Sequence, residues 1–141
     1  MEYSEVKDSG KREEMETGSV RDTREGKGRF DLIPAYAIER LAKHYENGAV
    51  KYGNNNWVKG QKVSRYIDSA KRHISKWEQG FDEEDHLSAA VWNIIAVICT
   101  QMWITIGLLP KELDDRFEVF PPTNPEKVEE FRNNLYKEKT Q

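Results

Sequence analysis

The chain has 141 residues, which suits one domain with a core of its own. Its net charge of −3 gives no broad positive field, so we expect no nucleic-acid partner. Its single cysteine, Cys99, excludes an intramolecular disulfide and favours a reduced, cytoplasmic setting.

Residues 1–18 are rich in Lys, Glu, Ser and Gly, and they predict a disordered tail ahead of a domain over residues 19–107. Residues 1–25 contain no apolar run of the kind a signal peptide needs. The polar, Gly-broken stretch at residues 19–31 carries four basic side chains. It is either a solvated lead-in or a basic arm that folds over an anionic ligand.

A first helix is predicted between Pro34, which suits a first turn, and Gly53, which suits a C-terminal stop. Its apolar residues recur at helical spacing. Glu39 and Glu46 lie two turns apart on a neighbouring face. Gly48, inside the helix, costs roughly 1 kcal/mol relative to Ala, which suggests a close approach of the backbone there.

Residues 54–63 (NNNWVKGQKV) predict a loop. Trp57 in this loop either covers the edge of the core or stacks on a nucleobase beside Asn56. A second helix is expected from an N-cap at Ser64 to Gly80. One face of that helix is polar: Arg65, Asp68, Ser69, Arg72 and Lys76. A row of this kind is usually solvated, but cations beside carboxylates also suit a metal–polyphosphate site.

A third helix is predicted from about Asp82 to Ile106, and it begins with an acidic cluster, DEEDH. Asp82, Asp85 and His86 share a face, which Asn93 continues. One interpretation is an acidic cap favoured by the helix dipole, with Asn93 satisfied in the core. The other is a row of carboxylates that holds a metal at the mouth of a bundle. Polar interruptions favour a buried or interface helix, so no membrane partner is expected.

Prolines break up residues 108–141, which predict a C-terminal extension with a short helix over residues 126–137. The sequence shows no repeats, zinc-ligand spacing, Gly-rich phosphate loop or strand alternation. The expected fold is therefore all-α, a small helical bundle. The third helix is apolar over more of its circumference than two modest helices can cover, so we expect a homo-oligomer, a dimer or tetramer, to complete the bundle.

Three segments resemble a phage family: DLIPAYAIERLAKHYENGAVKYGNNNW, RYIDSAKRHISKWEQG and DEEDHLSAAVWN. They are similar to the dATP/dGTP diphosphohydrolases of phages, within the MazG-like all-α nucleoside triphosphate pyrophosphohydrolases. The resemblance implies metal-dependent hydrolysis of a purine deoxynucleoside triphosphate to monophosphate and pyrophosphate. It also implies Mg²⁺ or Mn²⁺, an oligomer and, for a viral protein, the host cell cytoplasm.

The acidic spacing departs from the paired Glu-x-x-Glu and Glu-x-x-Asp of the wider superfamily. We therefore expect Glu46, Asp82 and Asp85 to bind the metal, since two or three carboxylates suffice for magnesium. Glu39 or Glu46 would orient the attacking water. The residues expected to bind the substrate are Lys51, Asn56, Trp57, Arg72, His73, Lys76, His86 and Asn93. The two histidines could instead orient the carboxylates.

Two alternatives remain open. The protein could bind a nucleotide without cleaving it, as a phage sponge for a host signalling nucleotide, which needs no carboxylate cluster. A structural or partner-binding bundle would explain the apolar helix but would leave the GAVKY, NNNW and DEEDH segments unaccounted for.

Overall fold

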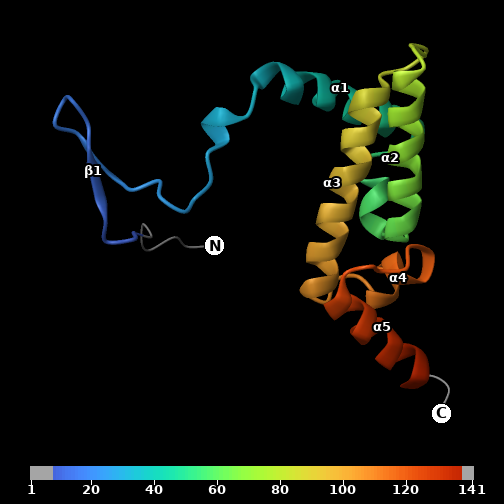
Figure 1. Ribbon diagram of the computed structural model, residues 1–141. Coiled ribbons are helices and arrows are strands. Elements are labelled where there is room, and N and C mark those ends of the chain that lie inside the picture. The colour runs from blue at the N-terminus through green and yellow to red at the C-terminus, as the bar shows by residue number, and fades with distance from the viewer. Residues whose placement is uncertain (1–7, 138–141) are drawn as a thin grey trace. The chain divides into compact units, whose positions relative to one another are not determined.

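Helices dominate the computed structural model, which describes residues 8–137 (Figure 1). The chain divides into two units, Met1–Ala35 and Tyr36–Gln141. The all-α prediction is confirmed, with the addition of one small hairpin. The predicted tail over residues 1–18 is described only from residue 8, so its first seven residues lie outside the described range, as do residues 138–141 of the predicted extension.

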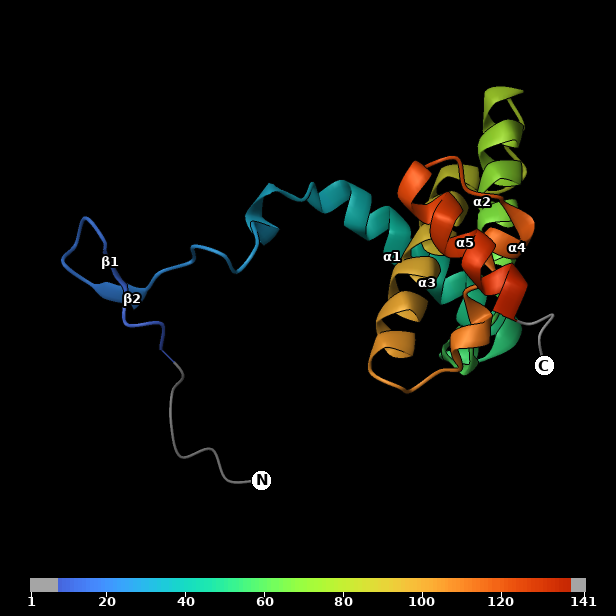
Figure 2. The same ribbon diagram turned by 60° about the horizontal axis from the view of Figure 1, so that its bottom comes forward.

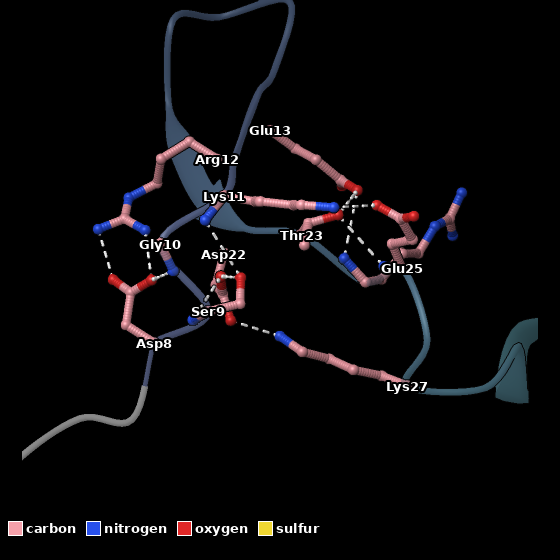
Figure 3. A network of polar contacts seen from close by, with 11 residues as sticks. Asp8, Ser9, Gly10, Lys11, Arg12, Glu13, Asp22, Thr23, Glu25 and Lys27 are labelled. Atoms are coloured by element: carbon pink, nitrogen blue, oxygen red, sulfur yellow. Dashed lines mark hydrogen bonds and ion pairs between the residues drawn. The ribbon is translucent and has the colours of Figure 1, made fainter.

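The first unit holds a β-hairpin that the sequence pattern did not predict. Strands β1 (Arg12–Glu14) and β2 (Val20–Asp22) pair antiparallel, with Glu13 opposite Arg21. Polar side chains hold the hairpin together (Figure 3): Lys27 Nζ reaches Asp22 at 2.5 Å, and Thr23 Oγ1 donates to Glu13 at 2.9 Å. Three-residue strands that are mostly exposed have too little alternation to stand out in a sequence. A 3-10 turn, η1 (Phe30–Leu32), follows.

Helix α1 (Ala35–Tyr52) begins directly after Pro34, and all of it beyond Ala35 belongs to the second unit. Gly53 ends this helix with φ of 86°, a left-handed conformation that glycine adopts without strain. A 3-10 turn, η2 (Asn56–Lys59), then leads to the next helix. Both boundaries of the predicted first helix are confirmed.

The core of the second unit is the helix pair α2 (Val63–Glu78) and α3 (His86–Thr105), which lie side by side and antiparallel (Figures 1 and 2). Small side chains line their contact and allow a close approach. The buried apolar residues are Val63, Tyr66, Ala70, Ala89, Ala90 and Ala96.

The C-terminal part adds η3 (Lys111–Leu113), α4 (Arg116–Val119) and α5 (Pro125–Lys137), the last of which matches the predicted short helix. Gly60 has φ of 93°, and a Cβ built there would lie 2.8 Å from Leu113 Cδ1. The loop before α2 therefore packs tightly on the C-terminal part only because residue 60 is glycine.

Two predicted helix starts are wrong. The second helix begins at Val63, and Ser64 lies inside its first turn, where its N–H and hydroxyl donate to Asp115 at 3.0 and 2.5 Å. The third helix begins at His86, with Asp85 as its N-cap. In both cases a carboxylate satisfies free N–H groups at the helix start.

By length and composition α3 could cross a membrane, with a mean hydropathy of 1.6 over its apolar window, 33% of which is buried. One such helix is weak evidence, because the core helices of soluble proteins have the same properties. That the protein has no membrane partner therefore stays a prediction.

Candidate functional site

The second unit contains a pocket of about 800 Å³, a volume within the usual range for sites that bind a ligand of nucleotide size. Side chains from α1, the loop before α2, α2 and α3 line it. The lining comprises Tyr45, Glu46, Gly48, Ala49, Tyr52, Gly53, Asn54, Asn55, Asn56, Trp57, Gln61, Arg65, Tyr66, Asp68, Ser69, Arg72, Trp92 and Asn93. Of the predicted site residues it thus includes Glu46, Asn56, Trp57, Arg72 and Asn93.

An aromatic cluster forms one wall of the pocket, with Trp92 of α3 at its centre. The ring of Trp92 lies 6.3 Å from Tyr45, 6.2 Å from Trp57 and 6.0 Å from Tyr66, between centroids. Trp57 also lies against Trp103, at 5.4 Å. The cluster therefore joins α1, η2, α2 and α3, and it gives the pocket a flat apolar surface of the kind that suits a planar ring.

The position of Trp57 is compatible with both roles that the sequence left open, and stacking on a nucleobase stays a prediction. Trp57 is half-buried, so it covers the edge of the core, and it also lines the pocket. Tyr66 is 2% exposed, and its hydroxyl has no hydrogen-bond partner among residues 8–137. A buried polar atom in a pocket wall is one that a water or a ligand would satisfy.

The polar side of the pocket comes from α2, where Arg65, Asp68, Ser69 and Arg72 face it. Arg72 donates to Asp68 at 3.0 Å and to Ser69 at 3.3 Å. Arg65 and Arg72 are exposed, so both guanidinium groups are accessible to an anionic ligand. The predicted polar face of this helix therefore forms the basic wall, except for Lys76, which does not line the pocket.

Asn93 and Gly48 complete the pocket from opposite helices. Asn93 is buried, and its amide donates to the carbonyl of Ala89 at 2.8 Å, which leaves its carbonyl oxygen for other partners. Gly48 has no atom within 4 Å of the position of a Cβ. The glycine in α1 therefore borders open space in the pocket, rather than a close contact between backbones.

Asp85, predicted as a metal ligand, has both carboxylate oxygens engaged. Arg40 donates to them from Nε at 2.6 Å and from Nη2 at 2.7 Å, and Ser88 donates from its N–H at 3.1 Å and from its hydroxyl at 2.7 Å. The Arg40 guanidinium, together with Ser88, holds the pKa of Asp85 well below its usual range. This geometry supports the interpretation of Asp85 as a helix cap.

The other predicted metal ligands do not converge with Asp85. Glu46 lies in the pocket and pairs with Lys43 at 2.7 Å, whereas Asp82 is exposed on the loop before α3. Among the described residues, the group of metal-ligand atoms that do lie close together belongs to His73, Glu84 and His86. The assignment of Glu46, Asp82 and Asp85 as one site therefore stays a prediction without support from the geometry.

Besides Asp82 and Asp85, five predicted residues lie outside the pocket lining, and each has its own surroundings. Glu39 is exposed on the first half of α1, and the ammonium of Lys51 lies 5.0 Å from the ring centroid of Tyr52. Lys76 pairs with Glu83 at 3.0 Å. His86 is 2% exposed, and its Nδ1 faces His73 Nδ1 at 3.0 Å.

Sequence reasoning did not assign Tyr45, Tyr66 and Trp92 to the site, although they form its wall. Helical spacing placed Tyr45 among the apolar residues of the first helix and Trp92 on the apolar surface of the third, and the pattern did not single out Tyr66. In the structure Trp92 packs against both tyrosines. Whether these rings also line a pocket depends on which side of the cluster other residues leave uncovered. A periodic sequence pattern does not indicate that side.

Comparison with known proteins gives a consistent result. The family described as "dATP/dGTP diphosphohydrolase, N-terminal" matches residues 17–115. The chain is 36% identical over 61 residues to a protein of Salmonella phage PMBT28 named dATP/dGTP diphosphohydrolase. That stretch is 43% of this chain and 21% of the phage protein, so the match spans about a fifth of the relative's length. No solved structure matches the chain.

Proposed function

Because the chain belongs to the family of dATP/dGTP diphosphohydrolase N-terminal regions, we propose that it hydrolyses a purine deoxynucleoside triphosphate to the monophosphate and pyrophosphate. The observation that carries this proposal is the pocket within the matched residues. Its lining combines aromatic side chains, which suit the flat base of a nucleotide, with basic side chains, which suit its phosphates.

Each wall has a role in the proposed reaction. Arg65 and Arg72 would bind the phosphates, since a guanidinium matches phosphate oxygens in two-point contacts. The base would pack against Trp57, with Asn56 and Asn93 as hydrogen-bonding groups. The hydroxyl of Tyr66, which has no partner in the described part of the chain, would bond to the bound nucleotide or to a water beside it.

Hydrolysis requires water to attack phosphorus and to break the α–β phosphoanhydride bond, so that pyrophosphate leaves and the nucleoside monophosphate remains. Glu46 lines the pocket and would orient that water and accept its proton. Glu39, the other candidate for this role, does not line the pocket.

We propose that the pocket also holds Mg²⁺ or Mn²⁺, and the donor set fits such an ion. Mg²⁺ binds proteins through one or two carboxylates and completes its shell with phosphates and water. Glu46 and Asp68 are the carboxylates of the lining. Their partners Lys43 and Arg72 form exposed ion pairs, which exchange readily. A bound ion would offset the charge that develops on the phosphate oxygens.

The test is to incubate the protein with each deoxynucleoside and ribonucleoside triphosphate, with Mg²⁺ or Mn²⁺, and to measure monophosphate and pyrophosphate. We expect dATP or dGTP to be cleaved. Arg72→Gln should lower kcat/KM by about tenfold or more, the loss expected when a charged hydrogen bond is removed. Lys71→Gln, one residue away and outside the pocket, is the matched control.

Two outcomes would contradict the proposal. If nucleotides bind with saturation but no pyrophosphate appears, the protein is a nucleotide sponge and not an enzyme. If Arg72→Gln cleaves as well as the parent does, the pocket is not where the phosphates bind.

A further inference from the structure

Three side chains outside the nucleotide pocket meet where α2 faces the start of α3. His73 comes from α2, Glu84 from the loop between the helices and His86 from the first position of α3. The two Nδ1 atoms lie 3.0 Å apart, and Glu84 Oε1 lies 3.6 Å from each of them. None of the three residues lines the pocket.

The triangle formed by these atoms has the size of one face of a metal coordination shell. Ligands at about 2.1 Å from a tetrahedral ion are about 3.4 Å apart, and neighbouring ligands of a six-coordinate ion are about 3.0 Å apart. The observed edges of 3.0, 3.6 and 3.6 Å bracket these values.

A hydrogen bond between the two imidazoles accounts for only part of this arrangement. One Nδ1–H could donate to the other Nδ1. The Glu84 oxygen, however, lies beyond hydrogen-bond range of both nitrogens, although it is nearly equidistant from them. A cation among the three atoms would use both nitrogen lone pairs and the negative oxygen at once.

The second nitrogen of the His86 ring, Nε2, has surroundings like those of metal-bound histidines. His86 is 2% exposed, and its Nε2 has no well-aligned hydrogen-bond partner among the described residues. Glu83 Oε2 lies 3.2 Å from that nitrogen, near enough for a small shift to align the bond. Metal-binding histidines commonly pass their second N–H to a carboxylate in this way. Lys76 holds Glu83 in place at 3.0 Å.

We propose that His73, Glu84 and His86 form a binding site for a divalent transition-metal ion, such as zinc or cobalt. Two imidazoles and one carboxylate suit such ions, whereas Mg²⁺ prefers oxygen ligands. The side chain of Glu84 is 49% exposed, so an ion can reach the site from solvent. Because its ligands come from α2, the connecting loop and α3, the ion would fix these elements to one another and stabilise the fold.

The experiment uses the full chain without an affinity tag, stripped with a chelator, and no nucleotide. Co²⁺ is added while its visible absorption is recorded, and Zn²⁺ is added while Tm is measured. We expect saturation at one Co²⁺ per chain and a rise in Tm with Zn²⁺. Mg²⁺ at the same concentration should not compete with Co²⁺.

Variants identify the ligands. His73→Gln and Glu84→Gln, at a half-buried and an exposed position, should each weaken Co²⁺ binding by more than about 100-fold. Glu83→Gln should weaken it by about 10–100-fold, as expected for a group that orients a ligand. Glu78→Gln, an exposed carboxylate at the end of α2, is the matched control and should bind like the parent.

Absence of a saturable Co²⁺ signal in the parent would overturn the proposal, as would parent-like binding by His73→Gln or Glu84→Gln. Equal competition by Mg²⁺ would also overturn it, because the site would then show no preference for ions that bind nitrogen ligands. The site does not depend on the proposed hydrolysis. If the parent binds Co²⁺ but releases no pyrophosphate, the proposed function of the pocket is wrong and the metal site stands. If the parent releases pyrophosphate but does not bind Co²⁺, the metal site is wrong and the proposed function stands.

Discussion

Two substitutions of Gly48 test the stability of α1 and nucleotide binding in the pocket separately. It lies inside the helix with nothing within 4 Å of its Cβ position, and it lines the pocket. Gly48→Ala should raise the free energy of unfolding by about 0.5–1 kcal/mol, because alanine loses less backbone entropy in a helix. Gly48→Leu should instead fill part of the pocket and raise KM for the nucleotide.

Denaturant melts and steady-state kinetics measure the two effects of Gly48. Asn47→Ala is the matched control, since Asn47 precedes it on the exposed side of α1 and is not part of the lining. If Gly48→Leu left KM unchanged, the nucleotide would not occupy this part of the pocket.

Substitutions of Asp85 show whether its carboxylate acts as a helix cap or as a metal ligand. Asp85→Ala should lower the free energy of unfolding by about 0.5–2 kcal/mol through loss of the cap on α3. Asp85→Asn should cost less, because asparagine caps nearly as well and only the charge opposite Arg40 is lost. Thermal melts in chelator measure both effects.

The metal-ligand hypothesis makes the opposite prediction for Asp85→Asn. Relief of repulsion among Asp82, Glu83, Glu84 and Asp85 would leave stability in chelator level or higher, while metal-dependent turnover would fall by orders of magnitude. That pattern would show that the ion pair with Arg40 gives way to metal in the working protein.

At the scale of elements, a buried carboxylate joins the start of α2 to the segment before α4. Asp115 is 3% exposed, and Ser64 donates to it twice. Asp115→Ala would leave the Ser64 N–H and hydroxyl buried without partners, so the free energy of unfolding should fall by about 2–4 kcal/mol. Asp114→Ala, at the neighbouring, less buried position, is the control for denaturant unfolding.

The same pair predicts how stability depends on pH. Burial raises the pKa of Asp115, but the hydrogen bonds from Ser64 outweigh burial and leave the pKa below its ordinary value. A lowered carboxyl pKa stabilises the fold above the unfolded-state value of about 4, and this contribution is lost as the pH falls below it. The stability difference between the parent and Ser64→Ala should therefore shrink between about pH 5 and pH 2. A difference independent of pH would contradict this.

Local patterns predicted the helices, because apolar spacing, Pro34 and Gly53 act within a few residues. They failed at Ser64, where a plausible N-cap bonds instead to Asp115, 51 residues away. An acidic cap at the start of the third helix was one of two interpretations, but local patterns did not indicate the second partner of Asp85, Arg40, which comes from another helix. A sequence identifies residues able to cap or to ligate, but long-range packing decides which of these roles each one takes.

For the whole molecule, the same limit applies to the pocket. Asn56, Trp57 and Arg72 were predicted from residue type, as groups able to contact a base or phosphates, and they line the pocket. Tyr66 was not singled out, and Trp92 was assigned only to the apolar surface of the third helix, although both line the pocket. The acidic cluster was visible in the sequence, but the loop between α2 and α3 places Glu84 beside two histidines and leaves Asp82 exposed. The metal-ligand set of Glu46, Asp82 and Asp85 therefore stays a prediction.

The last prediction concerns assembly. Val91, Ile94, Ile98 and Met102 follow one another at helical spacing on α3 and are 42–60% exposed, so they form an apolar stripe. Exposed apolar surface of this kind marks interfaces, and burying it stabilises association by about 25 cal/mol per Å². We expect the stripe to pack on its copy in a dimer or within a tetramer.

Ile98→Glu should convert the oligomer to a monomer, because dimerisation would bury a charge at the centre of the stripe. Ile98→Leu, which keeps the apolar surface, should assemble like the parent. Size-exclusion chromatography with light scattering at micromolar concentration measures both masses. A monomeric parent would contradict the prediction. A parent that stays monomeric and binds lipid vesicles would show that the stripe on α3 faces lipid instead, and Ile98→Glu would then abolish vesicle binding.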